Sequence, residues 1–283
     1  MKRLLALLPL LAAALVLSGC GSKDALTLDP VAEAASKTTN AGSSRVSFES
    51  TIWLLGKEVS FNAEGLYDYE RSRGSLTMDM SALMPGMSGL GAFELRQLDS
   101  TLYMRMPALP GAFLPEGKQW LSLDLDAALD KAGFGGLDPA NLQQQDPSQF
   151  LNLLRASSVE VREAGYDTVR GTDVTRYTAK LDLRKSVDAS LDQLELSDEQ
   201  EAALRRAAEQ LADQVGTKTI PVEVFVDDDG RLRRLNMDLS MTVQGQRLAL
   251  EQTVDYYDFG IEVDVDAPPA SQVYDLTNQL RSG

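Results

Sequence analysis

Short runs in which apolar and polar residues alternate dominate this chain. From 46 to 54, apolar side chains mostly alternate with polar ones, and a turn at Gly56-Lys57 leads into a second alternating run from 59 to 67. Alternation with a period of two places the apolar side chains on one face of a strand. The two runs therefore predict a hairpin with one apolar and one polar face.

The same alternation recurs along the rest of the chain. It predicts nine further strands, at or near 76–80, 93–97, 102–106, 120–123, 159–161, 173–183, 220–226, 232–241 and 248–257. Helical spacing and end signals predict short helices at 30–39, 125–131, 147–155 and 197–211. About eleven strands and a few helices predict an α+β fold with one large, strongly curved antiparallel sheet. The carboxyl end beyond Pro268-Pro269 is polar, and we expect it either to lie along the sheet or to fray.

The first residues carry an export signal. Lys2 and Arg3 precede an apolar run from 4 to 17 that is too short to remain as a membrane span. Leu17-Ser18-Gly19-Cys20 then looks like the lipobox of bacterial lipoproteins, whose cysteine receives a diacylglyceryl group before the signal is cleaved. Cys20 is the chain's single cysteine. We therefore expect a lipidated Cys20; the alternative is an ordinary secretory signal in which Cys20 is incidental.

This interpretation divides the chain into three parts. Residues 1–19 are the signal peptide, and residues 20–29 are the lipidated cysteine with a flexible tether. No second linker rich in Pro, Gly or Ser divides residues 30–283, so we expect one domain there.

The charge of the mature chain limits its partners. Cleavage removes Lys2 and Arg3 but no acid, so the formal net charge moves from -15 to -17. Such a chain repels the phosphates of nucleic acids, and no nucleic-acid partner is expected. It also repels anionic headgroups, so the lipid on Cys20 must supply the membrane attachment. We expect a monomer that is held at the extracytoplasmic face of the cell membrane.

The composition also excludes most kinds of catalytic site. There is no histidine, and the one thiol is used by the anchor. Cys-His and Ser-His-Asp arrangements, His-ligated metals and disulfides are thereby excluded. No hydrolase constellation is visible, so the sequence predicts a protein that is not an enzyme and has no cofactor or metal.

Several local patterns, in this order, carry a family resemblance. They are the lipobox, Leu102-Tyr103-Met104 before Trp120, Gly171-Thr172-Asp173-Val174-Thr175-Arg176-Tyr177, the strand-turn-strand run 221–234, and 256–263 before Ala267-Pro268. With them the chain resembles the actinobacterial LppX/LprG-type lipoproteins, which are similar in fold to the LolA/LolB carriers and to RseB-like sensor domains. The resemblance covers roughly residues 30 to 268.

The resemblance implies a half-barrel of about eleven antiparallel strands, with helices over its concave face and an apolar cavity for acyl chains between them. It implies no catalytic residues. The function expected first is a lipid-anchored carrier that binds a lipid, or the acyl chains of a lipoprotein, and that works with a membrane transporter or partner lipoprotein. The alternative is an RseB-like envelope-stress sensor or interaction module that regulates a membrane partner.

The cavity residues are assigned from pattern alone. They are the bulky apolar residues of the predicted strands, of the methionine-rich segment 78–93 and of the middle block: Phe48, Ile52, Phe61, Met78, Met80, Met84, Met87, Phe93, Met104, Phe134 and Phe150. Methionine suits a surface that accepts ligands of variable shape. The methionine-rich segment is therefore either a gate at the cavity mouth or part of the core. The apolar, glycine-interrupted segments 109–115 and 134–137 are further candidates for the mouth or for membrane contact.

The run Asp227-Asp228-Asp229-Gly230 has two interpretations. Consecutive acids between alternating strands fit a hairpin turn better than a calcium loop, which needs acids at alternating positions. The arginines that follow, Arg231, Arg233 and Arg234, either contact an anionic headgroup or pair with neighbouring acids.

Overall fold

The computed structural model describes residues 29–54, 56–79, 92–105, 114–131, 157–182, 219–243 and 246–277, and also Leu154, 184–186, Asp188, 201–202, 205–206 and Glu209. Its helices are α1 (Asp29–Thr39), α3 (Leu125–Lys131) and the short η2 (Ala270–Gln272). Its strands are β1 (Ser43–Leu54), β2 (Lys57–Asp68), β3 (Arg73–Asp79), β4 (Ala92–Leu98), β5 (Thr101–Arg105), β6 (Trp120–Asp124), β7 (Ser158–Val169), β8 (Thr172–Asp182), β9 (Thr219–Asp227), β10 (Leu232–Val243), β11 (Gln246–Tyr257) and β12 (Val273–Asp275).

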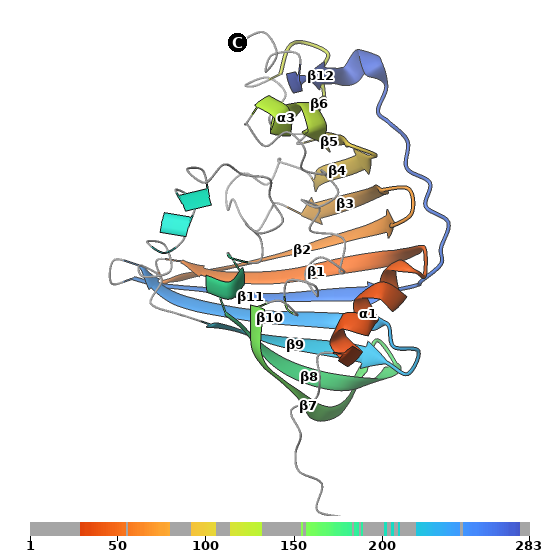
Figure 1. The fold of residues 1–283 in the computed structure, drawn as a ribbon. Helices are drawn as coiled ribbons and strands as arrows, with labels where there is room; N and C mark the ends of the chain where they lie inside the picture. Colours follow the sequence, from red (N-terminus) through yellow and green to blue (C-terminus); the bar gives the residue numbers. More distant parts are fainter. Residues whose placement is uncertain are drawn as a thin grey trace, which may run out of the picture.

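All the strands join one sheet, in the order β12-β6-β5-β4-β3-β2-β1-β11-β10-β9-β8-β7. The sheet is curved and does not close on itself (Figure 1). The predicted α+β half-barrel with a single curved sheet is therefore confirmed, and each of the eleven predicted strands is present. The sheet has twelve strands, however, because the three-residue β12 pairs with β6, and it does so in parallel. A strand of only three residues is too short to show an alternating pattern.

Strand register gives the sheet two faces. We call the apolar face the one that carries Phe48 of β1 and the residues opposite it in successive strands; the polar face carries Glu49 and the residues opposite it. Each strand contributes alternate residues to each face because its side chains point to opposite sides. The period of two in the sequence thus becomes a chemical difference between two surfaces.

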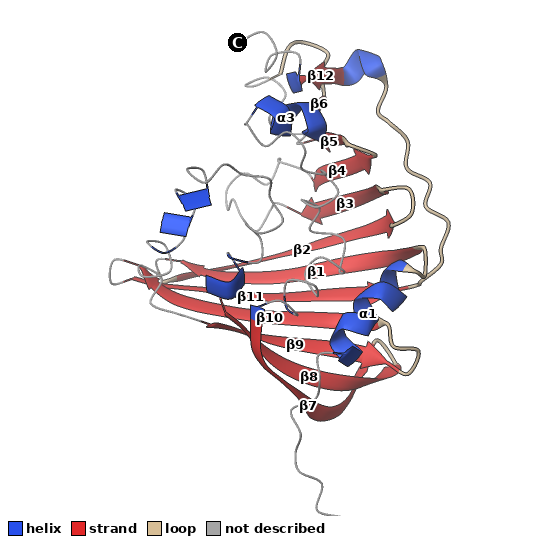
Figure 2. Cartoon of the chain, in the orientation of Figure 1, coloured by secondary structure: helices blue, strands red, loops and turns tan. Residues whose placement is uncertain are grey.

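Helix α1 packs against the apolar face. Pro30 lies in the first helical turn, where its missing N–H removes no helical hydrogen bond. Val31, Ala34 and Ala35 follow at helical spacing and are buried in the same core cluster as the strands beneath them. The helix crosses the sheet over its β8–β11 part (Figure 2).

One threonine ties α1 to the β9–β10 hairpin. The Thr38 hydroxyl donates to the carbonyl of Ala34 (2.7 Å) and accepts from the backbone N–H of Leu232 (2.8 Å). Both Thr38 and Leu232 are 0 % exposed. A buried N–H must find an acceptor, and here the helix supplies it.

The predicted helices at 30–39 and 125–131 are present as α1 and α3. Those at 147–155 and 197–211 lie mostly outside the described residues, where only Leu154 and residues 201–202, 205–206 and 209 are described, all helical. Within the described part of the chain, no helix combines the length and apolar character needed to cross a bilayer.

After β11 the chain runs along the ends of the strands to β12 (Figure 2). The N–H of Gly260 donates to the carbonyl of Ser43 (2.9 Å), and the Ser43 hydroxyl donates to the carbonyl of Ile261 (2.6 Å). Further on, Arg96 Nη1 donates to the carbonyl of Asp266 (3.0 Å). Beyond Pro268-Pro269, the N–H of Gln119 donates to the carbonyl of Gln272 (2.9 Å) and β12 pairs with β6. As far as Thr277 the carboxyl end therefore lies along the sheet, which is one of the two expected outcomes, and residues 278–283 lie outside the described residues.

Candidate functional site

A row of apolar side chains crosses four strands of the apolar face. Phe48 of β1 is opposite Ala63 of β2, Ala63 is opposite Met78 of β3, and Met78 is opposite Phe93 of β4. Phe48, Met78 and Phe93 are predicted cavity residues, and each is partly exposed. Directly opposite residues lie about 5 Å apart at their Cβ atoms, so these side chains form one continuous surface.

A second row continues toward the β12 edge. Leu76 is opposite Leu95, Leu95 is opposite Met104, and Met104 is opposite Leu121. Met104 is a predicted site residue, whereas the three leucines are additional to the predicted set. The alternation that predicts their strands also places these leucines on the apolar face, so they could have been identified from the sequence.

The third row lies nearer the β1–β2 turn. Ile52 is opposite Val59 on one side and Leu250 on the other, and Leu250 is opposite Leu239. Phe61 lies on the same face, two residues along β2 from Val59. The structure thus brings the six described members of the predicted set, Phe48, Ile52, Phe61, Met78, Phe93 and Met104, onto one face.

Helix α1 covers only part of this face. Beneath it Val224 and Leu235 are 0 % and 4 % exposed, whereas every residue of the three rows except Ala63 is partly exposed. The exposed part extends from β10 to β6, and the seven strands from β11 to β6 alone span about 29 Å at a strand spacing of about 4.8 Å. One leaflet of a bilayer has about 15 Å of hydrocarbon. The surface is therefore long enough for an acyl chain.

The remaining predicted site residues, Cys20, Met80, Met84, Met87, Phe134 and Phe150, lie outside the described residues. The same holds for residues 80–91 of the methionine-rich segment and for the segments 109–113 and 134–137. Whether residues 80–91 form a gate or part of the core stays a prediction.

The polar face is organised around a buried carboxylate. Asp255 is 4 % exposed and accepts from Arg234 Nε (2.6 Å) and Nη2 (2.8 Å) and from Arg170 Nε (2.9 Å). Arg170 also donates to the hydroxyl of Ser47 (2.8 Å) and lies 4.0 Å from the ring centre of Tyr257. This network joins β1, β10 and β11 to the β7–β8 turn.

The Asp227–Gly230 run is a hairpin turn with its own counter-charges. Gly230 has a positive φ of 78° and donates its N–H to the carbonyl of Asp227 (2.8 Å). The Asp227 carboxylate accepts from Arg231 Nε (3.2 Å) and Arg233 Nε (2.6 Å). With Arg234 bound to Asp255, the three arginines pair with neighbouring acids, as the second interpretation expected.

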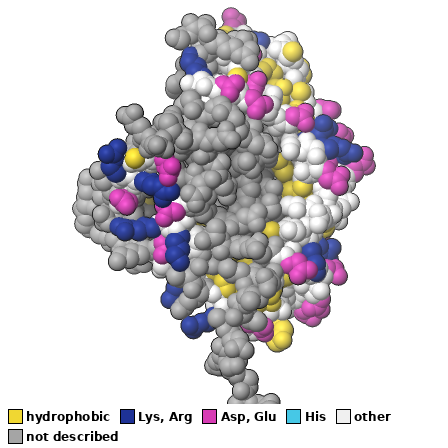
Figure 3. Space-filling view, in the orientation of Figure 1, with side chains coloured by type: hydrophobic (Ala, Val, Ile, Leu, Met, Phe, Trp, Pro, Cys, Tyr) yellow, Lys and Arg dark blue, Asp and Glu magenta, His cyan; other side chains and the backbone are white. Residues whose placement is uncertain are grey.

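Burial and hydrogen bonding act in opposite directions on these two carboxylates. Burial alone would raise the pKa of Asp255, but hydrogen bonds from Arg234 and Arg170 and their positive charges outweigh it and lower the pKa. The pKa of Asp227 is lowered in the same way, against its burial, by Arg231 and Arg233. Elsewhere on the described surface acids and bases also lie side by side (Figure 3), as where Arg205 pairs with Asp188 and Glu201.

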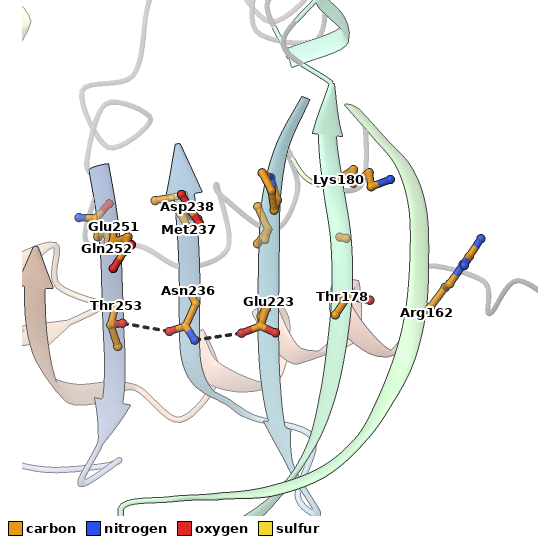
Figure 4. Close-up of a pocket in the computed structure, with 13 residues that line it drawn as sticks. Arg162, Thr178, Lys180, Glu223, Asn236, Met237, Asp238, Glu251, Gln252 and Thr253 are labelled. Carbon is orange, nitrogen blue, oxygen red and sulfur yellow. Dashed lines mark hydrogen bonds between the residues drawn. The ribbon is translucent and has the colours of Figure 1, made fainter. Parts of the chain in front are cut away.

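A hollow of about 590 Å³ lies on β7–β11, lined mainly by polar-face side chains. Across it the Thr253 hydroxyl donates to Asn236 (3.1 Å), whose Nδ2 donates to Glu223 (3.2 Å), as Figure 4 shows. Its acids and bases nearly balance, and the side chains of Thr253, Asn236 and Glu223 already bond to one another. The apolar face is therefore the stronger candidate for the functional site.

Comparison with known proteins places the chain beside bacterial lipoproteins. No family model matches it. A Streptomyces coelicolor protein named "putative lipoprotein" is 27 % identical over 254 residues, which cover 87 % of this chain and 73 % of that protein. The chain is similar to a lipoprotein. An uncharacterised 31.2 kDa protein of Streptomyces griseus is also 27 % identical, over 256 residues, covering 87 % of this chain and 78 % of the relative.

Solved structures of bacterial proteins are similar to the chain at lower identity. Mycobacterium tuberculosis lipoprotein LppX matches with a TM-score of 0.48 and 12 % identity, covering 85 % of this chain and 98 % of LppX. LprF of Mycobacterium bovis has a TM-score of 0.46 and 14 % identity, over 88 % and 99 % of the two chains. A LolA superfamily protein of Nitrosomonas europaea has a TM-score of 0.30 and 10 % identity, over 86 % and 96 %. The predicted resemblance is confirmed, and at these identities it concerns the fold alone.

Proposed function

We propose that this chain is a lipid-anchored, extracytoplasmic carrier that binds acyl chains on its apolar face. The observation that carries the proposal is the continuous surface of partly exposed apolar side chains from β10 to β6, beside the part that α1 covers. An apolar surface of this extent on an exported domain marks a binding site.

The driving force is removal of hydrocarbon from water. Each methylene that leaves water for an apolar surface contributes about 0.8 kcal/mol. Binding also removes protein surface from water, because the ligand covers side chains that the rest of the described chain leaves partly exposed, among them Phe48, Met78 and Phe93. A carrier of this kind lowers the cost of moving a lipid through water, and it needs no metal, nucleotide or catalytic residue.

Attachment to the membrane is the second part of the proposal. The lipobox predicts lipidated Cys20, and the relative from Streptomyces coelicolor is named as a lipoprotein. Eight residues lie between Cys20 and Asp29, the first residue of α1, so the tether reaches at most about 30 Å when fully extended. The carrier would then work close to the extracytoplasmic surface of the membrane that anchors it.

Native mass spectrometry of the chain from Leu26 onward, purified without detergent, tests the proposal. The residues removed contribute to no described element, so we expect the domain to fold and to carry a bound lipid that organic extraction releases. A folded protein without bound lipid, which also fails to take up a fluorescent acyl probe, would contradict the carrier function. That result would favour the alternative of a sensor module that binds a membrane partner.

A further inference from the structure

Two polar side chains face each other in the middle of the apolar face. Ser50 of β1 is directly opposite Gln252 of β11. Ser50 is opposite Phe61 on its other side, and Gln252 is opposite Met237 of β10. The pair is thus surrounded by the apolar residues of the candidate site.

Two other polar side chains on this face have partners within the protein. Ser44 bonds to the hydroxyl of Tyr69 (2.6 Å), and Gln97 donates to the carbonyl of Asp99 (3.1 Å). Ser50 is only 4 % exposed and Gln252 is partly exposed, yet neither side chain has a hydrogen-bond partner among the described residues. Among the described residues, the fully enclosed side-chain atoms without a hydrogen bond belong to Arg73, Arg105 and Arg176. The polar atoms of Ser50 and Gln252 therefore still reach the surface, and a ligand that covers them must supply their hydrogen bonds.

We propose that Ser50 and Gln252 bind an oxygen-bearing group within the lipid cargo, such as an ester carbonyl or a hydroxyl. This inference rests on the proposed carrier function and specifies its ligand. A serine hydroxyl and a glutamine carboxamide can each donate and accept, so together they satisfy either group.

The position of the pair sets where that group lies in the ligand. The row of Ile52 and Leu250 lies on one side of the pair and the row of Phe48 and Val254 on the other. An ester bound at Ser50 therefore has apolar surface on both sides, which fits a linkage between hydrocarbon segments rather than a headgroup at the rim. A plain hydrocarbon would cover the pair and leave both groups unpaired, which costs affinity.

A competition experiment tests this assignment. The chain from Leu26 onward is loaded with a fluorescent acyl probe, which is displaced by methyl palmitate or by heptadecane, both delivered from cyclodextrin. The two ligands have similar length but only one has an ester. We expect the protein to prefer the ester about fivefold, the ratio that one to two net hydrogen bonds give.

Gln252→Leu should reduce that preference to within about twofold by weakening ester binding alone. Met237→Leu is the matched control, because it changes shape next to Gln252 without changing polarity and should keep the preference. If Gln252→Leu has a lower melting temperature than the unaltered protein, Ser50→Ala repeats the test. An unchanged preference in the Gln252 and Ser50 variants, or no preference in the unaltered protein, overturns the inference and leaves the carrier function standing. Failure of both ligands and the probe to bind overturns both.

Discussion

At the scale of single residues, the apolar face contains two environments. Val224 and Leu235 lie in the core cluster with α1 and are buried, whereas Met78 and Phe93 share the same face and remain partly exposed. The first pair stabilises the fold. The second pair keeps apolar surface that a ligand can still cover, so substitutions there should alter binding more than folding.

Met78→Asp should lower the affinity for a fluorescent acyl probe at least tenfold, because it places a charge where hydrocarbon must pack. The free energy of unfolding should fall by only about 1 kcal/mol, since the site is partly exposed. Thr77→Asp is the matched control: Thr77 is the neighbouring residue, exposed on the polar face, and its change should leave probe binding intact. Probe titration and thermal melting are measured on each variant. An equal loss of probe affinity in Met78→Asp and Thr77→Asp would contradict the assignment of acyl binding to the apolar face.

A residue on the polar face should behave in the opposite way. Asp255→Asn removes the charge that holds Arg234 and Arg170, and should lower the free energy of unfolding by about 2 kcal/mol. The affinity of the folded variant for an acyl probe should be the same as that of the unaltered protein. Asp238→Asn, an exposed acid on β10, is the control and should change stability by less than about 0.5 kcal/mol. Urea denaturation compares the two, and equal effects would rule out a structural role for the Asp255 network.

At the scale of elements, α1 decides how much of the apolar face remains open. Its buried side covers the β8–β11 part, and its last turn is held by the hydrogen bond between Thr38 and Leu232. The position of the helix therefore depends on a hairpin that is distant in the chain, with a separation of 194 residues.

Thr38→Val keeps the shape of the side chain but removes the acceptor, leaving the buried Leu232 N–H unpaired. The free energy of unfolding should fall by about 1–3 kcal/mol. Thr39→Val, whose hydroxyl bonds only within its own helix, is the control and should cost much less. Amide hydrogen exchange should show faster exchange at Leu232 in the Thr38 variant alone. Unchanged protection at Leu232 would mean that this contact does not fix the helix.

At the scale of the whole molecule, acid should destabilise the fold. The pKa values of Asp227 and Asp255 are lowered in the folded chain by their arginines, although burial acts against this. The unfolded chain, with ordinary aspartate pKa values of about 3.9, then binds more protons as the pH falls. The stability these groups contribute is present above about pH 4 and is lost as the pH drops through the folded pKa values.

We therefore expect the free energy of unfolding to change little between about pH 5 and 7 and to decrease below about pH 4. Denaturant titrations at a series of pH values check this. Asp255→Asn should make the decrease shallower, because it removes one of the two linked groups. A rise in stability from about pH 5 to about pH 3 would contradict the lowered pKa values.

The location of the whole protein should depend on one residue. Cys20→Ser should abolish lipidation and leave little mature protein in the membrane, because a net charge of -17 does not favour binding to anionic lipids. Membrane fractionation and the mass of the N-terminal peptide measure this. The Asp238→Asn variant should stay in the membrane fraction. Quantitative membrane retention of processed Cys20→Ser protein would contradict the anchor.

The sequence by itself determined the strands and their two-faced character, and it predicts an export signal. Each depends on neighbours a few residues apart: alternation around Phe48 and Ile52, the turn at Gly56, and the small residues before Cys20. Such short-range patterns follow from the geometry of a strand, so alternation alone was enough to place the six described candidate residues on the apolar side of their strands.

Only the tertiary structure decided which parts of that face meet and which are covered. Register places Ser50 opposite Gln252, and Arg170 reaches Asp255 across 85 residues. No local pattern specifies these partners, because they depend on the strand order and on where α1 packs. For the same reason the sequence did not predict β12: its three residues form a strand because β6 offers a free edge.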